Sequence, residues 1–330
     1  MEIYLNSIGH DHPQHKIDNQ FFDSLDIGSS AEWVEERTGI QSRYSVLPQE
    51  TLRALRLGET DAQTLIKAKA VTTIADLATK PWQQATSRFG ETFPCDLLVC
   101  GTSIPDYDIP ANASTIAAKL QLKATAFDIN SACSSFVTDL EVTSSLLARG
   151  KYQRAAIFNV ERYSVRLNYA DKTSCVLFGD GAACTLLSTK PVGFRVVDTL
   201  VQSDASGFDT VVIPEGGLFW QNGARVQKFA IQKTCEATEN ILARNGLEIG
   251  NLSYFLGHQA NLRMLVSAAN KLGLAPEKHL YNVDKYGNQG AAGAPVVLSQ
   301  NWDRFKKGDL VAIAVVGSGL TWGSALLEFV

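Results

Sequence analysis

The pattern of apolar and polar positions along the chain predicts buried strands that alternate with helices. Segments 97–100 and 310–316 are uninterrupted apolar runs of strand length, with no polar residue on either face. Strands of this kind occur where helices cover both faces of a sheet. Helical patterns stand between successive strands, so the chain is predicted to fold as an α/β protein.

Two buried helices are predicted beside these strands. The segment 136–147 places its apolar side chains on one face, carries few charges, and is followed by a C-terminal stop at Gly150. A second helix is predicted to begin within "GNQGAAGAPVVL" (287–298), where small residues permit close approach of another backbone. We expect the two helices to meet at the centre of the molecule.

The chain contains an internal repeat. Four strand-like segments return in the same order and at a nearly constant offset: 93–103, 125–130, 152–160 and 181–189 match 252–260, 279–284, 308–317 and 323–330. Such agreement predicts two similar α/β halves, 1–190 and 191–330. Each half is expected to hold a sheet that helices cover on both sides.

Composition and charge exclude several classes of protein. The formal net charge of −4 lacks the basic excess that a nucleic-acid surface requires. No apolar run reaches the ~18 residues of a membrane span, and the N-terminus lacks the regions of a signal peptide. The six cysteines form no C-x-x-C pair, so they are expected to be reduced thiols. We therefore expect a cytoplasmic protein without a nucleic-acid or membrane partner.

Two further motifs have competing interpretations. His10, His12 and His15 crowd the N-terminus and could bind a metal, but no cysteine or acidic cluster joins them, so we expect a solvated loop and no metal site. The segment "GSGLTWG" (317–323) has the glycine spacing of a loose dinucleotide fingerprint. Too few residues follow it for the helix, strand and acidic ribose ligand of such a site, so no nucleotide cofactor is expected.

The candidate chemistry begins at Cys133. The stretch "DINSACSSF" (128–136) places this cysteine where a strand ends and a helix begins. Unpaired N–H groups and the helix dipole there favour a thiolate, and the cysteine's own N–H can face a developing oxyanion. The position suits a nucleophile, although an inert buried cysteine fits the same residues.

The second half supplies partners for this thiol. His258 ends the strand-like segment at 252–257, and Asn288 occupies the turn that matches Cys133 in the repeat. The repeat therefore places all three at one end of the sheets. A thiolate can attack a thioester while imidazole and amide donate hydrogen bonds to an enolate oxygen. The three residues thus predict acyl-thioester chemistry.

Several motifs resemble one known family along nearly the whole chain. "HQANLRML" (258–265) and "YGNQGAAG" (286–293) are similar to the histidine and asparagine motifs of thiolase-fold condensing enzymes, specifically β-ketoacyl-acyl carrier protein synthase III and its relatives. "EWVEERTGIQSRY" (32–44), "LFGDGAA" (177–183) and "GSGLTWGSALLEF" (317–329) also match. The resemblance implies a thiolase-like five-layer αβαβα fold built from two similar halves, and a homodimer.

The resemblance also implies roles for individual residues. It makes Cys133, His258 and Asn288 a catalytic triad, with an oxyanion hole formed by the backbone N–H groups of Cys133 and Ser318, where glycine is usual at the second position. The residues implied to bind substrate are Trp33, Arg37, Lys172, Lys228, Asn261, Arg263 and Val316. Lys172 stands where the family has an adenine-stacking arginine, and Val316 replaces a bulky aromatic. Arg37, Lys228 and Arg263 are expected to form a basic patch for an acidic carrier protein.

Three functions remain open on the sequence. The first is a condensing enzyme that forms a C–C bond by Claisen condensation through an acyl-cysteine, in a fatty-acid or polyketide-type pathway. It would need no cofactor and would take coenzyme A or acyl carrier protein thioesters as substrates. The second is an acyltransferase that passes the acyl group to an oxygen, nitrogen or sulfur nucleophile. The third is a non-catalytic partner subunit. An intact triad with Asn288 favours the first, because an enolate needs two donors.

Overall fold

The protein is an α/β structure arranged around one large mixed sheet; the computed structural model describes residues 1–330. The strands are β1 (Tyr4–Asp11), β2 (His15–Asp18), β3 (Ser42–Ser45), β4 (Leu97–Gly101), β5 (Thr125–Asp128), β6 (Arg154–Glu161), β7 (Gly181–Ser188), β8 (Phe194–Ser203), β9 (Val211–Val212), β10 (Trp220–Gln221), β11 (Tyr254–Gly257), β12 (Leu310–Gly317) and β13 (Thr321–Phe329).

The helices are α1 (Asn19–Asp23), α2 (Ala31–Thr38), α3 (Gln49–Leu57), α4 (Ala62–Lys67), α5 (Ile74–Phe89), α6 (Asn112–Lys119), α7 (Ser135–Ala148), α8 (Gly223–Arg244), α9 (Leu262–Lys271), α10 (Val283–Tyr286) and α11 (Gly293–Gln300). Three short 3-10 helices matter for the site: η1 (Ala132–Ser134), η2 (Tyr163–Val165) and η6 (Gly290–Ala292). Both predicted buried helices are confirmed, as α7 and α11.

The sheet has nine strands in the order β11-β12-β13-β8-β1-β7-β6-β4-β5. In the first half β4 pairs parallel to β6, β6 antiparallel to β7, and β7 antiparallel to β1. In the second half β11, β12, β13 and β8 repeat these senses of pairing in the same order. The prediction of two similar halves is confirmed. The boundary at residue 190, which stays a prediction, falls between β7 and β8.

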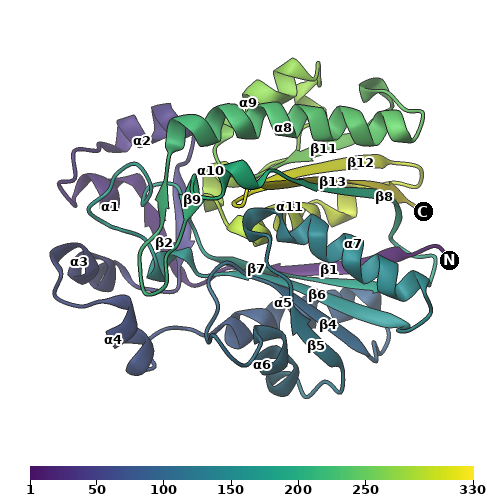
Figure 1. Ribbon diagram of the computed structural model, residues 1–330, viewed down its shortest axis with the longest axis horizontal. Helices are drawn as coiled ribbons and strands as arrows, with labels where there is room; N and C mark the ends of the chain where they lie inside the picture. Colours follow the sequence, from purple (N-terminus) through teal and green to yellow (C-terminus); the bar gives the residue numbers. More distant parts are fainter.

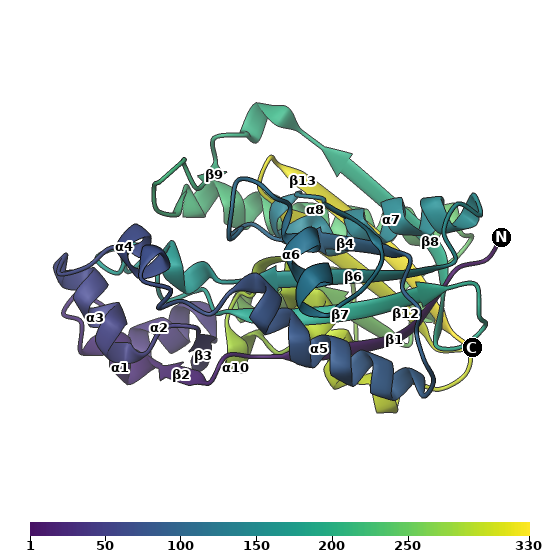
Figure 2. The ribbon, with the colours of Figure 1, turned by 90° about the horizontal axis from the view of Figure 1, so that it is seen from below.

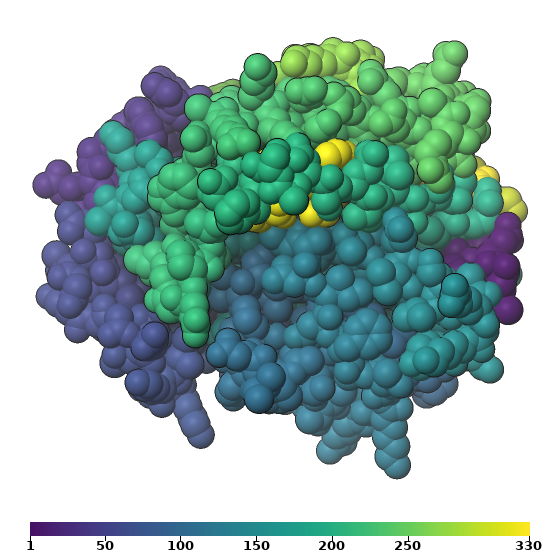
Figure 3. Space-filling view, viewed as in Figure 1, coloured from purple at the N-terminus to yellow at the C-terminus, as the bar shows by residue number.

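The two halves of the sheet join at only one point. There β1 pairs with β8 through Tyr4 with Arg195 and Leu5 with Phe194. Figure 3 shows the consequence for the whole molecule, in which the green and yellow residues of the second half lie over the blue and teal residues of the first. The halves are therefore held together mainly by what packs between them.

Helices α7 and α11 form the middle of the five layers (Figure 1). One core of 24 buried residues lies around them and includes Phe136 and Leu140 of α7, Val297 of α11, and strand residues from both halves. Helices α5 and α6 cover the outer face of the first half, as Figure 2 shows from below, and α8 and α9 cover that of the second. This arrangement is the αβαβα fold that the family resemblance implied.

The N-terminal histidines correct one expectation. His10 lies within β1 and His15 begins β2, so the segment is mostly strand and not a solvated loop. His12, between the two strands, stacks on Tyr286 and shares a hydrogen bond between its Nε2 and Gln289 Oε1 at 2.9 Å. Burial lowers the pKa of His12 to about 3. The apolar residues that flank these histidines make the segment a strand, because β1 is buried at the centre of the sheet.

No helix in the structure combines the length and apolar character needed to cross a membrane.

A buried ion pair fixes the end of β6. The Arg162 guanidinium lies 2.7 Å from a carboxylate oxygen of Asp106, and the side chains are only 2% and 7% exposed. Arg162 also donates to the Thr72 carbonyl at 3.0 Å, while Asp106 accepts the N–H of Ile74 at 2.9 Å. The pair thus holds the start of α5 and the 104–112 loop against the end of β6.

We predict that Arg162→Leu lowers the free energy of unfolding by ~3–5 kcal/mol, because it leaves the Asp106 charge buried and unpaired. Urea denaturation measures the change. Glu91→Gln is the control, since Glu91 pairs with Lys190 at the surface and such pairs contribute only ~0–1 kcal/mol. Equal losses in the two variants would contradict the assigned importance of the buried pair.

Candidate active site

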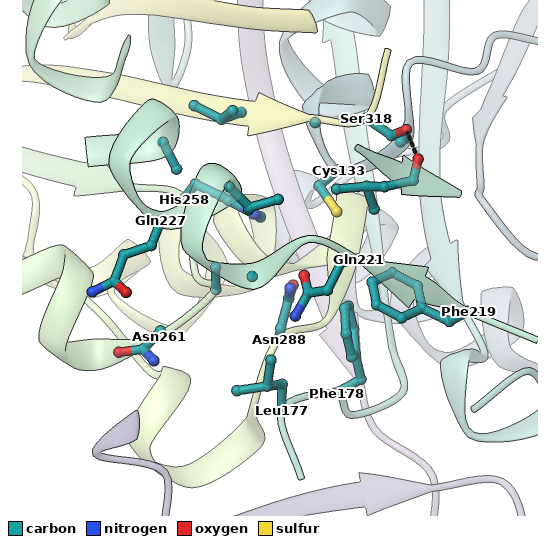
Figure 4. A pocket seen from close by; sticks show the side chains of 18 of the residues that line it. Cys133, Leu177, Phe178, Phe219, Gln221, Gln227, His258, Asn261, Asn288 and Ser318 are labelled. Atoms are coloured by element: carbon teal, nitrogen blue, oxygen red, sulfur yellow. Dashed lines mark hydrogen bonds between the residues drawn. The ribbon is translucent and has the colours of Figure 1, made fainter. Parts of the chain in front are cut away.

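A cavity of about 680 Å³ opens between the two halves. Cys133, His258 and Asn288 all line it, and Figure 4 shows the sulfur of Cys133 directed into the space between the other two side chains. Cys133 follows β5 and His258 follows β11, whereas Asn288 follows the short helix α10, so the strand predicted at 279–284 is wrong. Because parallel strands end at the same edge of a sheet, residues distant in sequence converge there.

Cys133 lies in η1, the single 3-10 turn between β5 and α7. Ala132 before it has φ of +50°, a left-handed conformation that a residue with a side chain adopts at a cost. The neighbouring serines hold this turn: Ser134 Oγ donates to the Ser131 carbonyl at 2.6 Å, and Ser135 Oγ donates to the Ala132 carbonyl at 2.8 Å. The small polar residues around the cysteine therefore fix the elbow that presents the thiol.

The electrostatics of the thiol correct a second expectation. Burial, followed by the negative charge of Glu161, raises the pKa of the Cys133 thiol to about 12. The expected thiolate is therefore wrong for the resting site, because desolvation outweighs the field of the short turn and the helix behind it. The Cys133 thiol is therefore neutral at rest, so any reaction at its sulfur requires a group that accepts the proton.

His258 and Asn288 can each donate a hydrogen bond. Burial lowers the pKa of His258 to about 4, so the imidazole is neutral and carries one N–H at physiological pH. The Asn288 side-chain oxygen accepts the N–H of Gly290 at 2.9 Å, which leaves the amide NH2 to face the cavity. The Asn288 backbone is bonded on both sides, to Leu177 and Gly179, at 2.8 and 3.0 Å.

Ser318 follows β12 and brings a second backbone N–H to the same cavity. Its hydroxyl donates to the Val211 carbonyl, drawn as the dashed line in Figure 4, so the side chain is directed away from Cys133. Neither the Cys133 N–H nor the Ser318 N–H donates to another backbone group. Two free N–H groups beside a nucleophile are the arrangement that stabilises an oxyanion.

Gly317 makes this arrangement possible. A Cβ on Gly317 would lie 2.5 Å from the Ser131 carbonyl oxygen and 2.8 Å from the Ser134 nitrogen. Only a residue without a side chain lets β12 approach the η1 turn so closely.

Of the residues predicted to bind substrate, five line the cavity and two lie outside it. Trp33, Arg37, Lys172, Asn261 and Val316 line the cavity. Two cations lie near the Trp33 ring: the Lys172 ammonium is 5.0 Å from the ring centroid and the Arg37 guanidinium 5.8 Å. Such a cluster can receive a planar or phosphate-bearing group.

Lys228 and Arg263 are exposed and lie outside the cavity lining. Arg263 donates to the carbonyls of Glu36 and Glu35 at 3.1 and 3.2 Å, so it ties α9 to the end of α2.

The structure adds lining residues that the sequence reasoning missed. They are aliphatic, aromatic and amide side chains, and the last two kinds include Tyr163, Phe178, Phe219, Gln221 and Gln227. Tyr163 follows the end of β6, and that position at a strand's carboxyl end was the available signal. Phe219 and Gln221 belong to the hairpin that β9 and β10 form. No local sequence pattern indicates that this hairpin folds over the cavity.

Comparison with known proteins gives one consistent result. Residues 127–205 match the family model described as 3-oxoacyl-[acyl-carrier-protein] synthase III, and residues 242–329 match the model of its C-terminal part. The chain is 30% identical to a β-ketoacyl-[acyl-carrier-protein] synthase III of Symbiobacterium thermophilum, over 99% of this chain and 98% of the relative. The corresponding enzyme of Clostridium perfringens is 32% identical over 96% of each chain.

Solved structures show the same similarity. The crystal structure of 3-oxoacyl-[acyl-carrier-protein] synthase III from Aquifex aeolicus superposes with a TM-score of 0.87 at 27% identity, over 99% of this chain and 100% of that one. A priming β-ketosynthase of the R1128 polyketide pathway superposes at 0.85 with 23% identity, over 99% and 96% of the two chains, and shares the fold.

We predict that Gly317→Ala abolishes acyl-adduct formation at Cys133, because its methyl group would push β12 and the Ser318 N–H away from the turn. Overpacking of this kind also lowers stability by ~1–3 kcal/mol. Intact-mass spectrometry after incubation with an acyl thioester measures the adduct. Gly250→Ala is the matched control, since a Cβ there meets open space. A normal adduct in Gly317→Ala would contradict the role of this close approach.

Proposed function

The chain belongs to the β-ketoacyl-[acyl-carrier-protein] synthase III family, and from that premise we propose that Cys133, His258 and Asn288 carry out its condensation reaction. The protein is an acyl-thioester condensing enzyme that forms a C–C bond through an acyl-cysteine. The observation that carries the residue assignment is the orientation of Asn288. Because Gly290 holds the side-chain oxygen, the amide NH2 faces the cavity beside a neutral imidazole.

In the acylation step, the Cys133 sulfur attacks the carbonyl carbon of an acyl thioester. The carbonyl oxygen becomes an oxyanion, which the N–H groups of Cys133 and Ser318 stabilise. The carbon–sulfur bond of the donor then breaks, and a thiol of coenzyme A or of a carrier protein leaves. The acyl group stays on Cys133.

In the condensation step, a malonyl-type or β-ketoacyl thioester enters the same cavity. A malonyl-type acceptor loses carbon dioxide, whereas a β-ketoacyl acceptor loses to solvent the proton between its two carbonyl groups. In either case the electron pair of the broken bond forms an enolate. The His258 N–H and the Asn288 amide donate to the enolate oxygen, and the enolate carbon attacks the acyl carbonyl carbon. The Cys133 thiolate leaves as the new C–C bond forms. Neutral donors suit this role because they do not protonate the carbanion.

Substrate contacts follow from the position of each residue. Trp33, Arg37, Lys172 and Asn261 line the cavity and would contact the pantetheine arm and nucleotide of coenzyme A. Arg37, Lys228 and Arg263 are positively charged, so they would attract an acidic carrier protein. The nucleotide phosphates of coenzyme A carry negative charge as well. Val316 and the aromatic residues beside it would contact the acyl chain. No cofactor is required, because the two thioester substrates supply both the acyl group and the carbanion. The reaction would belong to a fatty-acid or polyketide-type pathway.

We predict that Asn288→Ala still forms acyl-Cys133 but lowers the rate of C–C bond formation ~10²–10³-fold, the usual effect of losing one such donor. Decarboxylation of a malonyl-type thioester should fall equally, because it passes through the same enolate. Intact mass measures acylation, and product analysis measures condensation.

Cys133→Ala is the control for this experiment and should carry no adduct; an adduct in that variant would place the nucleophile elsewhere. If Asn288→Ala condenses at the wild-type rate, no enolate is stabilised there. Transfer to an oxygen, nitrogen or sulfur nucleophile would then describe the enzyme better. Absence of any adduct in the wild type would favour a non-catalytic partner subunit.

We also propose a homodimer, which the edge of the sheet supports. Strand β5 ends the nine-stranded sheet, so the outer side of its backbone has no partner strand. Near this edge the loop before α6 exposes large apolar side chains, with Ile109 87% and Tyr107 55% exposed. A second copy related by a twofold axis would pair β5 with β5 and continue the sheet across both subunits.

Light scattering at micromolar concentration should give about twice the chain mass of 35.8 kDa. Ile109→Glu should shift the mass towards the monomer, because a charge would be buried at the interface. Val192→Glu, which replaces an exposed apolar residue in the turn before β8, is the control. A monomeric wild-type protein with full activity would refute the dimer.

A further inference from the structure

A row of hydrogen bonds leads from the Cys133 thiol into the protein. The sulfur lies 3.6 Å from the Tyr163 hydroxyl, which donates to Ser103 Oγ at 3.0 Å. Ser103 Oγ in turn donates to Glu161 Oε1 at 2.9 Å. The row connects the proposed nucleophile with a buried carboxyl group, and the condensation steps above leave all three partner residues without a role.

The carboxylate gives this row a direction. When Glu161 is ionised it only accepts, so the single hydroxyl proton of Ser103 is committed to it. The Tyr163 proton is then committed to Ser103. Tyr163 has no other proton, so its oxygen accepts the S–H of Cys133. Each member donates to the next, which is the arrangement that lets a proton shift along the whole row.

Glu161 is suited to receive that proton. It is fully buried, and burial raises the pKa of its carboxyl group to about 8. The charged groups near it are Asp180, which raises this pKa further, and the Arg162 guanidinium, which pairs with Asp106. A carboxyl group with a pKa near neutrality exchanges protons readily at working pH.

Other contacts hold the row in place. The Tyr163 ring is 2% exposed and stacks on Phe178 with 4.5 Å between centroids. The backbone N–H groups of Ser103 and Ala291 donate to Glu161 at 3.0 and 3.2 Å. Gly290 has no room for a side chain, since a Cβ there would lie 2.6 Å from the Tyr163 ring. These contacts do not depend on the Tyr163 hydroxyl, so a variant can remove it and keep the packing.

We propose that Tyr163, Ser103 and Glu161 form a proton relay that activates the Cys133 thiol for acylation, an inference that rests on the proposed role of Cys133 as nucleophile. The S–H proton moves to the Tyr163 oxygen, the Tyr163 proton to Ser103, and the Ser103 proton to the Glu161 carboxylate. The sulfur keeps the electron pair and bonds to the thioester carbonyl carbon. The departing thiolate takes a proton from solvent. When condensation releases Cys133 as a thiolate, the proton returns along the same path.

The relay predicts a selective loss of acylation. Tyr163→Phe keeps the ring and its stacking but breaks the row, so the acylation rate should fall about 10²-fold, within the range of general acid–base catalysis. Ser103→Ala should have the same effect, because it removes the hydroxyl that links Tyr163 to Glu161. The Ser103 backbone N–H remains, so Glu161 should keep its position. Condensation measured from an enzyme already acylated at Cys133 should change less than about twofold, since that sulfur carries no proton.

Tyr169→Phe is the matched control. Tyr169 is another buried tyrosine, and its hydroxyl donates to the Ser164 carbonyl at 3.0 Å, outside the row. This variant should acylate at the wild-type rate. Rapid-quench mass spectrometry gives the acylation rate, and single-turnover product analysis gives the condensation rate.

The pH dependence separates a relay from a structural role. The carboxylate is the active form, so wild-type acylation should rise with pH through an apparent pKa near 8. Tyr163→Phe and Ser103→Ala should lose this inflection, because Glu161 is then disconnected from the thiol. Acylation at the wild-type rate in Tyr163→Phe would overturn the relay, and so would equal losses of acylation and condensation. An adduct that persists in Cys133→Ala would instead overturn the proposed nucleophile.

Discussion

The active site depends on the close approach of backbone turns at the centre of the molecule. The η1 turn from the first half lies against both the η6 turn from the second and the end of β12. Gly317 and Gly290 mark the contacts, where a methyl group would overlap the Ser131 carbonyl or the Tyr163 ring. Because the sheet halves share only the β1–β8 junction, the packing of α7, α11 and these turns sets the geometry of the catalytic residues.

Burial at this centre decides the protonation of the site. It raises the pKa of the Cys133 thiol and lowers that of the His258 imidazole, so both groups are neutral at rest. A neutral imidazole is a good hydrogen-bond donor for an enolate, but a neutral thiol is a poor nucleophile. The same burial therefore favours condensation and creates the need for a proton acceptor, which Glu161 can meet through Tyr163 and Ser103.

The two halves of the repeat divide the chemistry between them. The first half contributes the proposed nucleophile, Cys133, and the row of hydrogen bonds that begins at Tyr163, all near the carboxyl ends of β4, β5 and β6. The second contributes His258, Asn288 and the Ser318 N–H near the ends of β11 and β12. In the proposed mechanism, one fold used twice thus places acyl attachment on one side of the cavity and enolate stabilisation on the other.

Much of this was determined by the sequence alone. Apolar runs, the repeat and the small-residue turns predicted sheets covered by helices, two central helices and a common sheet end for Cys133, His258 and Asn288, because periodicity and strand ends are local properties that one chain displays directly. The family resemblance implied the five layers and the catalytic roles. The sequence reasoning was wrong about the charge state of Cys133 and the loop around His10 and His12, and it missed the link from Tyr163 through Ser103 to Glu161. A pKa depends on how much water the fold removes, and a hydrogen bond between residues 60 positions apart depends on which strand ends meet. Only the tertiary structure decides those, since burial and long-range contact arise when the two halves close over α7 and α11.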